Sequence, residues 1–413
     1  MILLGVDTMD RPPVAGEKAQ IGITSWPTGR TRVVAETDAW NFPQGGRQHF
    51  IRQGAALTFN VSCGGEWIGV VLDLANGTKT TLAKALYAVS PDGRTGYGLN
   101  FARLHRLGGY GYVGLPDPSA SEHVPNEEGL WQVDLESGQA RLLISIAAVV
   151  DTGQGLPGDC PHYLTHVVPS PSGRSLCFLH RYWLPDGGIR TRLMVCGSDG
   201  GNLRCWGEGY LSHFDWWDED TVLIWGRPPS ALQQGRNHPL FRVPLVRDLV
   251  RTGKPLIKKL LGRGAGGGGS YMLLTEKGFG GRSFASDLLR EDGHPSLRPG
   301  ARDWLLTDTY PDKDGVRPLL LCPVAEPRLI EIARLRETRH RAKEDRLAEA
   351  MEGMDERVRR SLTPRLFAHT RSGIHCDFHP RWLLAGDAVC FDSNHEGTRS
   401  VYGLEVGGVL GIH

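Results

Sequence analysis

The 413-residue sequence predicts an all-β protein, a seven-bladed β-propeller that carries one helical insertion in a late blade. Three observations support this prediction. The chain contains 54 Gly and 26 Pro, so turns are frequent. A pattern of an alternating apolar and polar run, a polar turn and a second alternating run recurs along it. One long segment instead has the composition of a helix.

The recurring pattern is that of a strand pair. A second kind of turn leads into an apolar run between the copies, as in SPDGRTGYGL and SPSGRSLCFL. Two alternating turn types are typical of four-stranded blades, so seven copies predict seven blades in a single domain over residues 1–413. The clear copies are 21–36, 69–82, 130–144 and 193–206, and the weaker copies are 240–256, 319–330 and 400–410.

Two segments depart from the pattern. Residues 262–271 are rich in Gly and predict a flexible loop. Residues 328–367 are dense in Ala, Leu, Glu and Arg with opposite charges at helical spacing, which predicts one or two exposed helices. These helices could form a lid or an arm that joins two copies of the chain. Their basic residues have acidic neighbours, which favours a solvated face over a nucleic-acid contact.

The charge balance argues against two classes of partner. The 47 Lys and Arg and 46 Asp and Glu give a net charge of +1, so no overall field attracts nucleic acid or an anionic membrane. No apolar stretch approaches the roughly 20 residues of a membrane-spanning helix, and no leader peptide is evident, which predicts a cytoplasmic protein. The eight Cys are scattered without a CxxC pair, and we expect free thiols.

Most of the histidines lie just before, or at the end of, an apolar run. Loops that enter the inner strands of a propeller converge at one mouth of its axial channel, so these histidines could meet there. Neutral imidazole is a common metal ligand, and the alternative is that each histidine fastens its own blade by hydrogen bonds. The residues concerned are His162, His166, His180, His213, His294, His375 and His379.

Arginines and tyrosines suggest how an anionic ligand could be held. Residues 100–114 are a Gly-rich stretch whose guanidinium and phenol groups could pair with carboxylates and support sugar rings; an ordinary surface loop is the alternative. Arg192 opens an apolar strand, where a buried charge needs a partner or a ligand. The predicted substrate contacts are Arg103, His105, Arg106, Tyr110, Tyr112, His166 and Arg181.

Three stretches in the second half of the chain resemble the oligogalacturonate lyase family of pectin-degrading enzymes, and more closely a group of bacterial propellers related to it. They are HFDWWDEDTVLIW, EDGHPSLRPGARDWLLTDTYPD and CDFHPRWLLAGDAVCFDSNHEGTRSVYGLEV. Members of the lyase family are cytoplasmic seven-bladed propellers that bind Mn and cleave short uronate oligomers by β-elimination. The resemblance therefore implies an acidic oligosaccharide substrate and a divalent metal, with Mn first and Zn or Ca as alternatives.

The resemblance also assigns catalytic roles. Arg192 and His213 match the family's catalytic arginine and histidine base in order and approximate spacing. Two other functions stay open at this point. The propeller could bind a glycan or another ligand without turnover, or it could be a scaffold that recruits a partner through its inserted helices.

The metal ligands that the resemblance implies are partly altered. His294 matches one ligand, and His379 matches the last histidine of a Gln-then-His-Pro-His run. Asp377 stands where the first histidine of that run would be, and Ile374 stands where the Gln would be. A carboxylate can also ligate Mn. We therefore expect a site formed by His294, Asp377 and His379, which His375 could complete.

Overall fold

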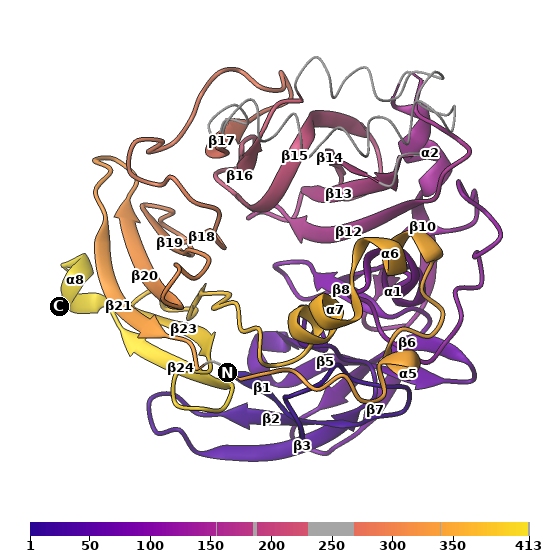
Figure 1. Ribbon diagram of the computed structural model, residues 1–413, viewed down its shortest axis with the longest axis horizontal. Helices are drawn as coiled ribbons and strands as arrows, with labels where there is room; N and C mark the ends of the chain where they lie inside the picture. The colour runs from indigo at the N-terminus through magenta and orange to yellow at the C-terminus, as the bar shows by residue number, and fades with distance from the viewer. Residues whose placement is uncertain (154, 185–187, 230–267, 339, 412–413) are drawn as a thin grey trace.

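Figure 1 shows short antiparallel strands in sheets that follow one another around a ring, and the strands of the described residues form six sheets. The computed structural model describes residues 1–153, 155–184, 188–229, 268–338 and 340–411. First strands of successive sheets lie side by side, since β8 contacts β12 and β18 contacts β22. The protein is therefore mostly β, in a propeller arrangement, with few helices.

Each sheet is built from strands that are consecutive in the sequence. The first three sheets contain β1 (Ile2–Gly5), β2 (Ala19–Thr24) and β3 (Thr31–Thr37); β4 (His49–Ile51), β5 (Ala56–Cys63), β6 (Glu66–Asp73) and β7 (Lys79–Leu82); and β8 (Leu86–Val89), β9 (Thr95–Gly98), β10 (Gly129–Asp134) and β11 (Ala140–Ser145). The last three contain β12 (His162–Pro169), β13 (Ser175–Trp183), β14 (Ile189–Gly197), β15 (Arg204–Trp216), β16 (Val222–Arg227) and β17 (Ser270–Leu274); β18 (Ser296–Leu297), β19 (Trp304–Asp308), β20 (Val316–Pro323) and β21 (Ile330–Arg336); and β22 (Arg381–Trp382), β23 (Ala388–Ser393) and β24 (Ser400–Glu405).

The predicted number of seven blades is wrong for the part of the chain that the structure describes, because its strands form six sheets. The 13-residue strand β15 explains the difference. Its first half, through Gly209, pairs with β14, and its second half, from Tyr210, pairs with β16. Irregular pairing between Leu211 and Phe214 bends the strand. Segments that would count as two repeats thus belong to one hydrogen-bonded sheet.

Five of the seven predicted strand pairs are present as expected. The copy at 240–256 lies outside the described residues. The copy at 400–410 is wrong, because β24 is followed by the short helix α8 (Gly407–Leu410) and not by a second strand. Residues 262–267 of the predicted loop also lie outside the description, and its last residues begin β17.

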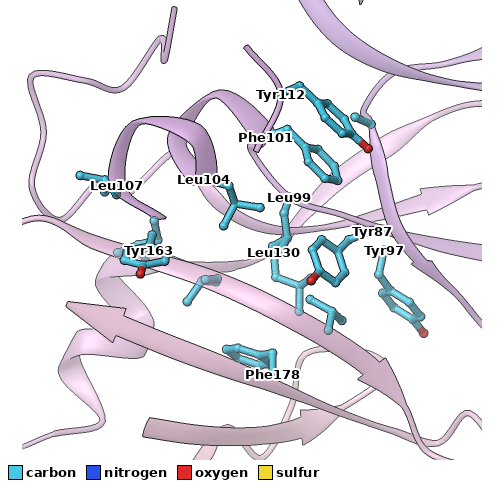
Figure 2. Packing of buried hydrophobic residues seen from close by; sticks show 14 of the residues in the cluster. Tyr87, Tyr97, Leu99, Phe101, Leu104, Leu107, Tyr112, Leu130, Tyr163 and Phe178 are labelled. Atoms are coloured by element: carbon cyan, nitrogen blue, oxygen red, sulfur yellow. The ribbon is translucent and has the colours of Figure 1, made fainter. Parts of the chain in front are cut away.

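Apolar clusters fill the space between neighbouring sheets. In Figure 2 the ring of Phe101 lies over Tyr112, and Leu104 lies near Tyr163 of β12. Phe101 and Tyr112 are stacked with 4.1 Å between ring centroids. Burying one such aromatic or leucine side chain stabilises the fold by about 1.5–3 kcal/mol. Because sheets are covered on both faces, Phe178 and its neighbours in β13 form a continuous apolar run.

The predicted loop at 100–114 contains the helix α1 (Phe101–Gly108). The side chain of Asn100 accepts a hydrogen bond from the backbone N–H of Arg103 and so caps the helix. Gly109, at φ +70°, ends it in the left-handed conformation that suits glycine. The 3₁₀ turn η1 (Arg52–Gly54) and the helix α2 (Ile146–Asp151) complete the helical elements of the first half that the structure describes.

The predicted helical insertion at 328–367 begins later than expected. Its first residues form β21, the edge strand of the fifth sheet. Three short helices then follow, α5 (Leu347–Ala350), α6 (Glu356–Ser361) and α7 (Pro364–Arg371). Their buried side chains join the same apolar cluster as α1, so these helices pack on the ring and are not simply exposed.

All eight cysteines are free thiols, as predicted. In the part of the chain that the structure describes, the helices are too short and too polar to cross a bilayer.

Candidate metal centre

Three histidines from successive parts of the ring meet at its inner edge. His213 lies in the second half of β15, while His294 and His379 each lie two residues before the first strand of their sheet. The ring centroids of His213 and His294 are 4.1 Å apart, and those of His294 and His379 are 4.5 Å apart. The expectation that histidines from separate strands converge is met by these three residues.

His294, Asp377 and His379 have the geometry of a cation site. Their ligand atoms all lie within 4.8 Å of one another. The Nδ1–H of His294 donates to Asp308, whose two carboxylate oxygens are 2.9 and 3.0 Å away. Its Nε2 is buried and has no hydrogen-bond partner among the described residues. Metal-bound histidines are usually held in this way, with one nitrogen on a carboxylate and the other on the ion. The residues present therefore fit a divalent cation.

Asp377 is held in its charged form by two neighbours. The Nη1 of Arg317 donates to one carboxylate oxygen at 2.9 Å, and the Nε2 of His375 lies 3.3 Å from the other. Burial alone would raise the pKa of Asp377, but the hydrogen bond from His375 and the charges of nearby imidazoles lower that pKa well below its ordinary value. His375 thus contacts a predicted ligand and is not part of the three-residue cluster itself.

The two imidazoles of the cluster differ in their affinity for protons. Burial would lower the pKa of His294, but the Asp308 carboxylate raises it above the ordinary value. Burial, followed by the charge on His294, lowers the pKa of His379 well below the ordinary value. Acid should therefore compete with a cation more strongly at His294 than at His379, since a ligating nitrogen must be unprotonated.

His213 has the orientation of a general base. Its Nδ1 lies 3.1 Å from Oδ1 of Asp292 and 3.2 Å from the hydroxyl of Ser212. Because a carboxylate only accepts hydrogen bonds, this contact places the proton on Nδ1 and leaves the lone pair on Nε2. Tyr310 borders the same space, with its ring centroid 6.3 Å from that of His213.

Three of the predicted substrate contacts lie beside this cluster. The Nη1 of Arg181 donates to the hydroxyl of Tyr110 at 2.9 Å, and the ring of Tyr110 is 6.2 Å from that of His166. Burial, then the charges of Arg181 and His213, lowers the pKa of His166 well below its ordinary value. His166 has a φ of +56° at an irregular point of β12, which redirects its side chain.

Four other predicted contacts are engaged elsewhere. Arg103 donates to Asp117, Ser119 and several backbone carbonyls, and only 2% of its surface is exposed. His105 and Arg106, which also lie on α1, bond to the carbonyl of Glu352 and to Asp117. The remaining one, Tyr112, receives a hydrogen bond from Asn60 in the core. These contacts fasten α1, and the structure does not bring the four side chains to the cluster.

Arg192 is also placed away from His213. Its guanidinium donates to the hydroxyl of Thr152 at 2.9 Å and to the carbonyl of Val149 at 3.1 Å, and it contacts His180 at 3.3 Å. Arg192 and His180 are directly paired across β13 and β14, so their side chains share a face. Arg181, the next residue along β13, points to the other face.

The sequence did not single out Asp292, Asp308, Tyr310 or Arg317. Asp308 ends the apolar strand β19 and Tyr310 lies two residues beyond it, and a search for polar residues at strand ends could have found them. Arg317 and Asp292 have no such signal, because their roles arise from contacts with Asp377 and His213.

Fold and cluster together define the class: a β-propeller in which two histidines and an aspartate are grouped closely enough to hold a metal ion. Neither a scan of protein-family models nor a search of the curated proteins gives a match.

Several solved structures are similar in fold. A puromycin-hydrolyzing peptidase from Mycobacterium tuberculosis is 13% identical, with a TM-score of 0.50, and the match covers 98% of this chain and 51% of that one. This chain thus spans about half of the peptidase. An oligogalacturonate lyase in complex with manganese is 15% identical, with a TM-score of 0.47, over 95% of this chain and 98% of that chain. The β-propeller domain of the Trilobed protease from Pyrococcus furiosus is 10% identical, with a TM-score of 0.46, over 97% and 90%.

Proposed function

We propose that the protein is a metal-dependent lyase that cleaves uronate-containing oligosaccharides by β-elimination. One observation carries the proposal: the imidazole of His213 lies beside the cluster of His294, Asp377 and His379. A base next to a cation site is what this reaction needs. The sequence resemblance to the oligogalacturonate lyases supports the choice of reaction.

The cation would be held by two imidazoles and one carboxylate. This mixed set suits Mn or Zn, and Mn is our first choice because of the same resemblance, with Ca as a further alternative. β-Elimination removes the C5 proton of a uronate, which is weakly acidic because the adjacent carboxylate is already an anion. A bound divalent cation supplies Lewis acidity that neutralises this carboxylate and stabilises the charge that develops as the proton leaves.

The protein's own residues then perform the proton transfer. The free Nε2 of His213 takes the C5 proton, while Asp292 holds the ring and stabilises the charge that it gains. The electrons of the C5–H bond form the C4–C5 double bond, the bond from C4 to the glycosidic oxygen breaks, and that oxygen takes a proton from solvent. Arg181, which lies beside His166, would bind the carboxylate of the sugar, since the predicted catalytic arginine, Arg192, is engaged elsewhere.

The proposal is tested with protein purified without chelator. Its metal content is measured first, and the protein is then incubated with oligogalacturonates and other uronate oligomers in the presence of Mn²⁺. We expect new ultraviolet-absorbing unsaturated ends, and we expect their formation to stop when a chelator is added. A metal-loaded protein that produces no unsaturated ends from any of these uronates would refute the lyase function.

A further inference from the structure

The helical segment α5–α7 links distant parts of the ring before the chain reaches the cation site. It leaves the fifth sheet after β21 and ends directly at the ligand loop, residues 372–380, which contains Asp377 and His379. In Figure 1 the segment lies across the face of the ring near α1, which belongs to the third sheet. The chain therefore enters the ligand loop from a helix that packs near α1, and not directly from the neighbouring fifth sheet.

The segment is fastened to α1 by apolar and polar contacts. Met354 and Val358 are buried in the cluster that contains Leu104 and Leu107 of α1. The backbone N–H of Asp355 donates to the carbonyl of Arg106 at 2.9 Å. His105 and the carbonyl of Glu352 are 2.8 Å apart, which adds a second polar contact. These contacts bury part of the apolar side of the helices against α1. The lid or dimer arm that the sequence suggested stays a prediction.

Arg371, the last residue of α7, forms the contact nearest to the ligand loop. Its guanidinium donates to the carbonyl of Gly109 and, at 3.4 Å, to that of Gly108. Carbonyls at the end of a helix lack partners within the helix and form the negative end of its dipole, so a guanidinium is well placed there. The same group lies 5.9 Å from the ring centroid of Tyr110, whose hydroxyl binds Arg181.

Beyond Arg371 the ligand loop has little freedom. A Cβ at Gly373 would come within 2.7 Å of Phe42 and 2.8 Å of Met9, so the backbone is closely packed. The side chain of Asn394 donates to the carbonyl of Ile374 at 2.9 Å. Only residues 372–376 separate Arg371 from Asp377. A displacement at the end of α7 would therefore be passed on to the cation ligands.

We propose that Arg371 is a positioning residue, which fastens α7 to the end of α1 and thereby sets the place of Asp377 and His379. It acts through the loop and does not touch the cation or the substrate. The inference rests on the proposed metal centre. It gives the helical segment the role of holding the ligand loop at a fixed position relative to α1.

The test compares Mn²⁺ binding by calorimetry to the full-length wild type and to three variants. Arg371→Met removes both hydrogen bonds, and we expect about a 10- to 100-fold loss of Mn²⁺ affinity, the usual cost of disturbing residues behind a metal ligand. Arg371→Lys keeps the charge but has no planar fork to reach two carbonyls, so its loss should be smaller. Arg365→Met is the matched control, because Arg365 is exposed on the same helix, and its affinity should equal that of the wild type.

The electron paramagnetic resonance spectrum of bound Mn²⁺ should also change in Arg371→Met, which a loss of stability alone would not cause. Wild-type affinity in both Arg371 variants would overturn the inference while leaving the metal centre intact. If Arg371→Met fails to fold, Arg371→Lys decides by the same criterion. A wild type that binds no Mn²⁺ would instead refute the metal centre and this inference together.

Discussion

His294 and Asp308 form a pair in which one carboxylate oxygen accepts two hydrogen bonds, from the backbone N–H of His294 at 2.7 Å and from its Nδ1 at 2.9 Å. Asp308 is buried at the end of β19, with 1% of its surface exposed. The pair fixes the imidazole ring and leaves its Nε2 free for a ligand.

Replacing Asp308 by Asn should weaken metal binding. The amide keeps the shape of the carboxylate but not its charge, so we expect about a 10- to 100-fold lower Mn²⁺ affinity by calorimetry. Asp314→Asn, at an exposed position near β20, serves as the control and should bind Mn²⁺ like the wild type. Unchanged affinity in Asp308→Asn would show that His294 is not a ligand.

Replacing His213 by Ala should abolish most of the elimination activity. Loss of an essential base typically lowers the rate by about 10²- to 10⁴-fold. The rate of formation of unsaturated ends measures this loss, while Mn²⁺ affinity should change far less because His213 lies outside the three ligands. His340→Ala on the surface is the control. If His213→Ala forms product as fast as this control does, the base is another residue.

Replacing Arg317 by Met should strongly destabilise the fold. The side chain of Arg317 is 0% exposed and pairs with Asp377 at 2.9 Å and Glu337 at 3.4 Å. Removing one partner of a buried ion pair leaves unpaired charge, which costs about 3–5 kcal/mol in the free energy of unfolding. Urea unfolding of the metal-free protein measures this cost.

The control is Arg334→Met, which removes the exposed pair of Arg334 with Glu331 and should cost less than about 1 kcal/mol. Adding Asp377→Asn to Arg317→Met should cost less than the two single changes summed, because the residues are in contact. Equal losses in Arg317→Met and Arg334→Met would contradict the buried pair.

The stability of the protein should fall with acid, in part through His105. Burial lowers the pKa of His105 to about 4. The unfolded chain, with a pKa near 6.5, takes up this proton first, so stability that is present above about pH 6.5 is lost as the pH falls towards 4. From pH 7 to pH 5 this one group should lower the free energy of unfolding by about 2 kcal/mol.

The variant His105→Gln can still donate to the carbonyl of Glu352 and has no proton to gain. Urea unfolding at both pH values should show a decrease that is smaller by about 2 kcal/mol than that of the wild type. His340→Gln, on the surface, should retain the wild-type decrease. A His105→Gln protein that loses as much stability as the wild type would refute this assignment.

Much of the local structure could be predicted, because strands and turns depend on neighbouring residues. The alternating run at 69–82 is the strand pair β6 and β7, as expected. The sheet count could not be predicted, since nothing local in β15 shows that its two halves pair with different strands of one sheet. The start of the insertion was misplaced because β21, at the edge of its sheet, is rich in charged residues.

The site was predictable in part. The resemblance to the oligogalacturonate lyases implied His294, Asp377 and His379 as ligands, and the structure brings their ligand atoms together. Arg181 and Arg192 both lie in apolar runs. From the sequence, Arg192 was the predicted catalytic arginine and Arg181 only a predicted substrate contact, whereas in the structure Arg181 is the one near the cluster. Side chains alternate along a strand, so which of them faces His166 depends on how β13 and β14 sit in the ring.

By itself, then, the sequence determined the all-β class, most strand pairs and the histidines worth examining, because these follow from patterns over a few neighbouring residues. Only the tertiary structure decided that Asp308 holds His294, that Arg317 holds Asp377, and that the helical segment packs against α1. Such contacts join residues that are far apart in the chain, and closure of the ring is what brings them within hydrogen-bonding distance.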